Sequence, residues 1–394
     1  MYRIKPRHIL WRFLLPLIFL LIAWVISLQY INYSSGNIIL PMLWKLSDKC
    51  NIGKREDIDI IIGIWGKQLR NISKYLQPAL YNISREACSD HFYPDFESNI
   101  RKVINYKINT NAPCVENTHL DGHYVDSITN RNDDIPVIVT AASSDHFHEV
   151  QGLLKSIHTN LIPFYKNMKV IFYDIGLTQK ESKAMKDYCK CEVRTFKFHQ
   201  FPSHVRLLDA YAWKPLIIFE VLKEFKLIMW LDSCIRFFNQ RKYMVKENLD
   251  YIFKKTKLIG IQLQQSPRWI VSKHTKPDTF EYLDELECLY DYPELESGWI
   301  VISKNLFVVN AIIKPWVGCA LTENCMTHPF PRFLKPCSKD LWKFLLWTKC
   351  HRFDQSVLNI IIIRIFNRFR KIIEFDGSQI ASISRGEKVN YFPN

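Results

Sequence analysis

Glycine is scarce in this sequence: 12 glycines occur among 394 residues, well below the roughly 7% typical of globular proteins. This scarcity excludes collagen-like and glycine-linker architectures. Neither GxxxxGK[ST] nor GxGxxG occurs anywhere in the chain, which argues against a P-loop kinase and against a Rossmann dehydrogenase with its usual fingerprint. No C-x-x-C pair is present either, so structural zinc is a less favoured interpretation of the cysteines than disulfides.

Acidic residues are outnumbered by basic ones, 39 to 53, which gives a net charge of +14. With 48% hydrophobic and 23% charged residues, the composition is that of a globular protein and excludes a wholly disordered chain. The basic residues are spread along the sequence rather than clustered. The excess therefore fits anionic small substrates or an anionic membrane surface, and we expect no nucleic-acid partner.

The N-terminus predicts the compartment. Residues 13–44 contain no charged side chain, and the strongly apolar residues 13–31 are long enough to cross a ~30 Å hydrocarbon core. Basic side chains precede this run, namely Arg3, Lys5, Arg7 and Arg12. The positive-inside rule then predicts a cytosolic tail at 1–12, a transmembrane signal anchor at 13–31 and a luminal body. A cleaved signal peptide is the alternative, disfavoured because no A-x-A-like site follows. We expect a single-pass type II protein of the Golgi or endoplasmic reticulum membrane.

Two further features agree with a luminal body. N-x-[ST] sequons occur at Asn32, Asn71 and Asn82, and we predict glycans on Asn71 and Asn82. Asn32 is too near the predicted span. Eleven cysteines occur, most of which should pair in an oxidising compartment while the odd count leaves at least one over. The zinc alternative would use residues from the last third of the chain, namely Cys319, Cys325, His328, Cys337, Cys350 and His351.

The chain changes character near residue 132. Residues 32–131 indicate a stem and an irregular N-terminal subdomain, within which 60–65 is a strand or a short helix. From 132 to 394, β-branched apolar runs alternate with helical patterns, which predicts an α/β fold with a mainly parallel sheet flanked by helices. The expected strands are 135–140, 169–173, 192–198, 226–231, 258–262 and 299–302. The expected helices are one capped by Ser143 or Ser144 and ending near 158, then 178–189, 214–225 and 353–366.

Ligands of such sheets bind at the carboxyl ends of the strands. Asp232 directly follows the apolar strand 226–231 (KLIMWL), so a rigid element delivers its carboxylate to that edge. Such a carboxylate can hold a divalent cation, which in turn can neutralise a diphosphate. The structural alternative is that Asp232 caps the next segment or pairs with Arg236.

Two more motifs follow in order. Ser297 and Gly298 are small residues before the strand 299–302, where a ligand can approach the backbone closely, although an ordinary turn also explains them. Asp354 and Gln355 begin the helix 353–366, where Asp354 could serve only as its cap. Four tryptophans lie near these motifs, and sugars and bases stack on such rings; we expect one of them to meet the ligand. They are Trp213, Trp230, Trp269 and Trp299.

The order of these elements resembles glycosyltransferases of the A-type fold, especially the family-8-like retaining enzymes. Their pattern is a basic residue with a helix, a strand ending in D-x-D, a small-residue-Gly strand and D-Q-x-x-x-N. The matching elements here are Lys214, Asp232-Ser233-Cys234, Ser297-Gly298 and the stretch 354–359 (DQSVLN). Residues 211–215 and 230–237 are also similar to an uncharacterised invertebrate family of type II membrane glycosyltransferase-like proteins. The resemblance covers residues 133–380.

The resemblance implies a nucleotide-diphospho-sugar transferase-like sheet and a hexosyltransferase-like enzyme. It would move a sugar from a nucleotide-sugar, expected to be a UDP-sugar, to a luminal glycan or glycoprotein. Lys214, Asp232, Ser297 and Gly298 would bind the donor. Asp354 and Gln355 would be the catalytic pair that contacts the sugar or acceptor.

One departure affects the cofactor. The second acid of D-x-D falls at Cys234, which is not a ligand for hard cations. Asp232 could still hold Mn²⁺ or Mg²⁺ with a later residue such as His328 or His351. Alternatively, the donor phosphates are neutralised by basic side chains, with Lys214, Arg206 and Arg268 as candidates. Cys234 itself should stay outside the disulfides, because it lies beside the expected nucleotide site.

Two other functions stay open. A luminal sulfotransferase would need a glycine- and lysine-rich phosphate loop after the first strand, which residues 140–144 (TAASS) lack. A non-catalytic membrane-anchored protein that kept the transferase fold would tolerate loss of the second D-x-D acid.

Overall fold

The computed structural model describes residues 58–74, 88–106, 135–327, 337 and 350–393. All of them belong to one compact unit. Among the described residues, no helix is long and apolar enough to cross a membrane. The predicted span at 13–31 lies outside the described residues, as do Asn32, Asn82 and His328.

A seven-stranded sheet forms the centre of the described unit, in the order β3-β2-β1-β4-β7-β6-β8. Neighbouring strands pair in parallel from β3 to β4, and β6 pairs in parallel with β8, whereas β7 is antiparallel to both β4 and β6. The prediction of a mixed α/β fold with a mainly parallel sheet is confirmed. The strands are β1 Val137–Ala142, β2 Val170–Asp174, β3 Glu192–Thr195, β4 Leu227–Leu231, β6 Ile261–Ile270, β7 Pro293–Ser303 and β8 Glu374–Phe375. Two further strands, β5 Ile235–Phe237 and β9 Ala381–Ile383, pair in a small antiparallel sheet.

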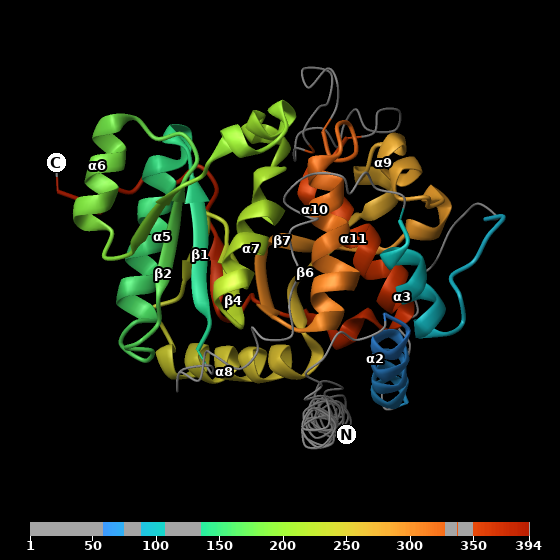
Figure 1. Cartoon of the computed structure of the whole chain (residues 1–394). Helices are drawn as coiled ribbons and strands as arrows, with labels where there is room; N and C mark the ends of the chain where they lie inside the picture. Colours follow the sequence, from blue (N-terminus) through green and yellow to red (C-terminus); the bar gives the residue numbers. More distant parts are fainter. Residues whose placement is uncertain (1–57, 75–87, 107–134, 328–336, 338–349, 394) are drawn as a thin grey trace, which may run out of the picture. The chain divides into compact units, whose positions relative to one another are not determined.

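Helices cover both faces of this sheet (Figure 1). The helices of the described residues are α2 Ile58–Ser73, α3 Phe96–Ile104, α5 Phe147–Asn160, α6 Gln179–Tyr188, α7 Trp213–Glu224, α8 Lys242–Ile259, α9 Pro277–Tyr282, α10 Lys314–Leu321 and α11 Phe353–Phe366. Shorter helical turns are η2 Ser144–His146, η3 Phe198–Gln200, η4 Ser203–Arg206, η5 Leu208–Ala210, η6 Val271–His274, η7 Glu287–Tyr290, η8 Val308–Ile313 and η11 Asn367–Ile372. Figure 1 shows the unit running from α6 and α5 on one side to α11 and α3 on the other.

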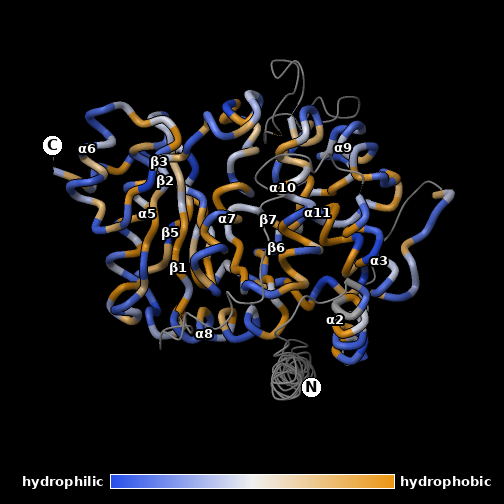
Figure 2. The backbone as a smooth tube through the Cα atoms, viewed as in Figure 1, coloured by the Kyte–Doolittle hydropathy of each residue, from blue (hydrophilic) through white to orange (hydrophobic). Residues whose placement is uncertain are grey.

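Successive side chains of β4 point to opposite faces of the sheet, so they pack in two different hydrophobic cores. Leu227, Met229 and Leu231 join a cluster with α5 and α8, so Ile228 and Trp230 must point to the other face, which α7 covers. Every residue of β1 and β4 is buried, as expected for strands covered on both faces. Figure 2 shows the hydrophobic residues concentrated along such inner strands. β4 is therefore rigid because it is covered on both faces, and it ends directly before Asp232.

The local chemistry explains where several elements begin and end. Thr178 caps α6 through a capping box with Glu181, which agrees with the helix predicted at 178–189. Residues 258–262 were predicted as a strand, but α8 continues through Ile259. Gly260 then ends the helix at φ +99°, a conformation that glycine adopts readily, and β6 starts one residue later. Residues 60–65 lie in a helix, α2.

Other differences are small. Ser143 does not cap a long helix: its hydroxyl hydrogen-bonds Asp145, a turn of 3₁₀ helix follows, and α5 begins at Phe147. The segment 32–131, predicted to be irregular, contains α2 and α3 in its described part, and α3 packs against α11. Asn71 lies in the last turn of α2 with a partly exposed side chain.

Disulfides connect distant and local segments. They join Cys88 to Cys288, Cys189 to Cys191, Cys319 to Cys325 and Cys337 to Cys350, while Cys234 is free and buried. The predictions that most cysteines pair and that Cys234 does not are confirmed for the described residues. Cys50 and Cys114 lie outside them.

Candidate functional site

Antiparallel pairing of β4 with β7 brings two of the predicted motifs together. Leu231 pairs with Trp299, and the backbone N–H of Asp232 donates to the carbonyl of Gly298 at 2.8 Å. Ser297 and Gly298 therefore lie inside β7 rather than in a turn before it. They occupy a point where the β6–β7 register shifts, between the pairs Leu263–Ile300 and Gln264–Glu296. Such a bulge opens the strand beside the Asp232 carboxylate.

Lys214, another of the predicted site residues, is buried next to Asp232 and Ser297. It lies in the first turn of α7 and is 1% exposed. Its Nζ lies 3.0 Å from Asp232 Oδ1 and 2.8 Å from Asp354 Oδ2, and 3.5 Å from Ser297 Oγ. The ammonium is thus held between two carboxylates from β4 and α11. The structure brings together all six residues predicted as donor-binding or catalytic.

Lys214 and Asp232 keep each other ionised. Burial by itself would lower the pKa of Lys214, but Asp232 and Asp354 raise it above its ordinary value. Burial raises the pKa of Asp232, yet Lys214 and a hydrogen bond from Trp230 Nε1 at 2.8 Å bring it below its usual range. Lys214 and Asp232 are therefore both charged at neutral pH, and together with Asp354 they form a buried triad. The rings of Tyr211 and Trp230 face the ammonium, each with its centroid 5.5 Å from Nζ.

Asp232 is the member of the triad that a ligand can reach. Its side chain is 23% exposed, against 2% for Lys214 and 5% for Asp354. Oδ1 faces Lys214 and Trp230, so Oδ2 remains on the side of Gly298. A Cβ at position 298 would lie 2.9 Å from this oxygen, too close without movement, so glycine is needed for the approach. Asp232 does not pair with Arg236, which instead contacts Glu387 and the carbonyl of Glu149.

The amides of α11 hold the backbone of β7. Gln355 Oε1 accepts from the Ser297 N–H at 3.2 Å, and its Nε2 donates to Glu294. One turn later, Asn359 bonds both the N–H and the carbonyl of Leu295, at 2.7 and 2.8 Å. The D-Q-x-x-x-N motif therefore fixes the opened part of β7 and supplies the inner carboxylate of the triad.

Two aromatic residues carry backbone strain at this site. Tyr211 and Phe353 have φ of 55° and 46°, a left-handed conformation that is costly for bulky side chains. Each lies shortly before Lys214 or Asp354, and their ring centroids are 6.2 Å apart. Burial and Asp232 raise the pKa of Tyr211 to about 12. Strain of this kind persists where the surrounding structure holds it, and it gathers at functional sites.

Sequence reasoning missed a second set of polar residues beside the triad. Arg352 Nη2 lies 3.6 Å from Glu296 Oε2, and its Nε 3.5 Å from Glu294 Oε2. The guanidinium also lies over Trp269, 5.9 Å from the ring centroid. Arg352 lies two residues before Asp354, and Glu296 directly precedes Ser297. Adjacency to those motifs is the signal that could have pointed to both.

The remaining candidate residues differ in how exposed their side chains are to solvent. Trp213, Trp230 and Trp299 are buried, whereas Trp269 is partly exposed. Trp269 is therefore the ring of the four that a sugar could stack on. His351 is buried, and both of its ring nitrogens have protein partners: one accepts from the Lys276 N–H and the other contacts the Met326 carbonyl. Arg206 is exposed on η4, and the Arg268 side chain lies outside the described residues.

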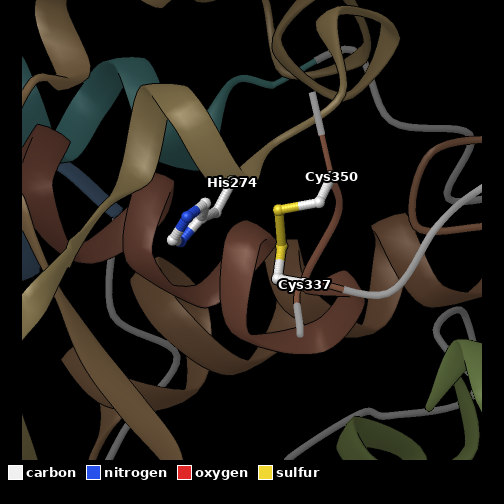
Figure 3. A group of neighbouring side chains, drawn as sticks. All are labelled: His274, Cys337 and Cys350. Atoms are coloured by element: carbon white, nitrogen blue, oxygen red, sulfur yellow. A yellow bond between two sulfur atoms is a disulfide. The ribbon is translucent and has the colours of Figure 1, made fainter. Parts of the chain in front are cut away.

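A divalent cation does not fit the described residues around Asp232. The Lys214 ammonium already occupies the position next to Oδ1, and Cys234 is 2% exposed. Burial raises the pKa of its thiol to about 12, so it is not a thiolate ligand. Within the described residues one trio has metal-ligand spacing, His274 with Cys337 and Cys350. Figure 3 shows these two sulfurs joined as a disulfide, which leaves no thiolate for a metal.

A protein-family model matches part of the chain. The model of a family described as "Protein of unknown function (DUF1647)" matches residues 115–219, a stretch that includes Lys214 and ends before Asp232. No curated protein matches the chain.

Among solved structures, the chain is similar to the galactosyltransferase LgtC in complex with donor and acceptor sugar analogs. The identity is 12%, over 56% of this chain and 69% of that one, with a TM-score of 0.30. It is also similar to core-mannan synthase A from Aspergillus fumigatus in its Mn/GDP form, at 10% identity over 66% and 80%, with a TM-score of 0.33. A third similar structure is apo mouse xyloside xylosyltransferase 1, at 11% identity over 61% and 84%, with a TM-score of 0.33. At these values the likenesses decide nothing about activity, and we base the functional proposal on the site itself.

Proposed function

We propose that this protein is a glycosyltransferase that moves a sugar from a nucleotide-sugar, a UDP-sugar, to a luminal glycan or glycoprotein. One observation carries the proposal. A partly exposed carboxylate, Asp232, stands at the carboxyl end of a rigid parallel strand, beside a glycine that leaves the backbone open and above a buried lysine. In α/β sheets this edge is where nucleotide ligands bind.

Each residue then has a physical role in the transfer. Asp232 accepts hydrogen bonds from the ribose of the donor, and the opening at Ser297 and Gly298 admits the sugar. Lys214 does not reach the ligand directly, because it is buried; it keeps Asp232 ionised and oriented. Asp354 and Gln355 act in the same way, through Lys214 and the Ser297 N–H. Such fixed polar groups lower the barrier because they need no reorganisation during the reaction.

The acceptor would bind on the side of Arg352, Glu296 and Trp269. Trp269 offers a partly exposed ring for a sugar face, and the carboxylate and guanidinium offer hydrogen bonds to hydroxyls. We place the body of the enzyme in the lumen of the Golgi or endoplasmic reticulum, as a single-pass type II protein. This part of the proposal rests on the charge asymmetry around residues 13–31.

The test is an assay of the full-length chain in mild detergent with UDP- and GDP-sugars, measuring nucleotide release with and without glycan acceptors. Asp232→Asn preserves shape but loses the charge. We expect it to lower turnover by about 100-fold or more. Asp187→Asn, at an exposed position on α6, is the matched control and should leave turnover unchanged. A folded Asp232→Asn variant with near-normal turnover would refute the role of Asp232.

A non-catalytic binding protein is the second candidate. The observation in its favour is that Lys214 already neutralises Asp232 and Asp354, while Cys234 replaces the second acid of D-x-D. It predicts that the chain binds a nucleotide-sugar with no release of nucleotide in any acceptor mixture.

A further inference from the structure

We infer that the donor diphosphate is neutralised by Arg385 of the C-terminal segment rather than by a divalent cation. This inference rests on the proposed function, and it concerns how that function is carried out. It combines the misfit of a cation at Asp232 with the placement of an arginine that no sequence motif singled out.

Lys214 and Arg385 together match the two carboxylates of the triad, which leaves the triad no excess of negative charge to attract a dication. Asp232 and Asp354 share the ammonium of Lys214, at 3.0 and 2.8 Å. Arg385 adds a second positive charge close enough to interact with Asp232, Glu296 and Tyr211. Two cations thus balance the two carboxylates of the triad. A dication would meet repulsion from both, in a region where water screens charges poorly.

The main chain around Arg385 is held firmly against the segment that follows Asp232. Strand β9 pairs with β5, so that Ile235 faces Ile383. The Ser384 N–H then donates to the Cys234 carbonyl at 2.8 Å, and the Gly386 N–H donates to the buried carboxylate of Glu149. The residues on both sides of Arg385 are therefore held by hydrogen bonds from their backbone N–H groups.

Glu149 ties this arrangement to the site itself. Its other carboxylate oxygen accepts from the hydroxyl of Ser233, the residue after Asp232. On the far side, Glu387 pairs with Arg236 Nε at 2.7 Å. The C-terminal segment is thus joined to the segment after Asp232, directly or through Glu149, at Ser384, Gly386 and Glu387. Arg385 lies between Ser384 and Gly386, which are both held in this way, and its charge interacts with that of Asp232.

The chemistry of Arg385 suits a diphosphate. The residue is exposed, so it can reach a ligand. Loss of hydration would lower the pKa of its guanidinium, but the neighbouring Asp232 and Glu296 raise it above its ordinary value. A planar guanidinium can donate two parallel hydrogen bonds to phosphate oxygens and stays charged at every relevant pH.

In the transfer, the bond between the anomeric carbon and the β-phosphate oxygen breaks, and its electron pair stays on the diphosphate. The acceptor oxygen bonds to the anomeric carbon and its proton passes to solvent. Arg385 keeps its proton throughout and stabilises the negative charge that grows on the leaving diphosphate.

The experiment is calorimetric titration of the full-length chain in detergent with UDP, GDP and uridine, in EDTA and in Mn²⁺. We expect UDP or GDP to bind with a Kd that differs by less than about 3-fold between EDTA and Mn²⁺. Arg385→Ala should weaken this binding by roughly 10-fold or more, the loss of a charged hydrogen bond, while uridine binding changes little. Arg385→Lys should restore part of the loss. Lys388→Ala, an exposed cation on the same segment, is the matched control.

The outcomes separate the two proposals. Diphosphate binding that disappears in EDTA overturns the present inference and leaves the proposed function standing. An unchanged Kd for UDP or GDP in a folded Arg385→Ala variant also overturns the present inference and leaves the proposed function standing. If neither UDP nor GDP binds the native chain under either condition, the proposed function fails and takes this inference with it.

Discussion

Replacement of Lys214 by methionine tests the buried triad directly. The side chain is 1% exposed, and its Nζ lies 3.0 and 2.8 Å from two carboxylates. Methionine has similar length and no charge, so the change leaves Asp232 and Asp354 without their shared cation. Breaking a buried ion pair from one side costs about 3–5 kcal/mol, since the remaining charge loses its compensation. We expect the free energy of unfolding to fall by this amount at pH 7.

The assay is urea unfolding of the full-length chain in mild detergent, followed by tryptophan fluorescence. With a slope of about 3 kcal/mol per molar urea, the midpoint should fall by about 1 M or more. Lys223→Met is the matched control: Lys223 also lies on α7, but its pair with Glu220 is exposed. Exposed pairs contribute at most about 1 kcal/mol. The double variant Lys214→Met with Asp354→Asn should recover part of the loss, because one uncompensated charge is removed.

The pH dependence gives a second measurement. In the native chain the folded pKa of Asp232 is lowered, so its stabilising contribution is present above the unfolded pKa of about 3.9 and is lost as pH falls through the lower folded value. Without Lys214, the largest of the interactions that lower the pKa of Asp232 is lost, so its folded pKa is higher than in the native chain. The stability deficit of the variant should then shrink as pH falls from 7 towards 4. Equal stability losses in Lys214→Met and Lys223→Met, or a deficit independent of pH, would refute the triad.

Three further predictions can be checked separately. Protease treatment of intact microsomes should leave the C-terminal body protected, and glycosidase should shift the mass of the chain through Asn71 and Asn82; digestion without detergent would reverse the topology. Cys234 should resist maleimide at pH 7.5 in the native chain and react fully in urea, because its thiol is buried and its pKa is raised to about 12; rapid native labelling would contradict the structure. Trp269→Ala should raise the KM for a glycan acceptor by about 10-fold, the loss of one stacked ring, with little change in stability; an unchanged KM would place the acceptor elsewhere.

Most elements of the α/β fold could be predicted from local patterns. The runs that form β1, β2 and β4 are apolar and β-branched, and their burial on both faces follows from that composition. The strand that ends at Asp232 was placed to within one residue. The error at 258–262 also has a local cause, since apolar residues at the end of α8 look like a strand until the φ of Gly260 is known.

The site needed more than local pattern. Local pattern established which residue types were available: a carboxylate after a buried strand, a small-residue pair, and an acid and amide at a helix start. The tertiary structure alone decided that β7 runs antiparallel to β4, which sets Gly298 against Asp232 and lets α11 bring Asp354 to Lys214. It also decided that a segment about 150 residues after Asp232 returns as β9 and carries Arg385 to the same edge. Periodicity reports the burial of a segment, whereas the pairing of distant strands depends on the whole set of competing contacts, and no short stretch of sequence encodes it.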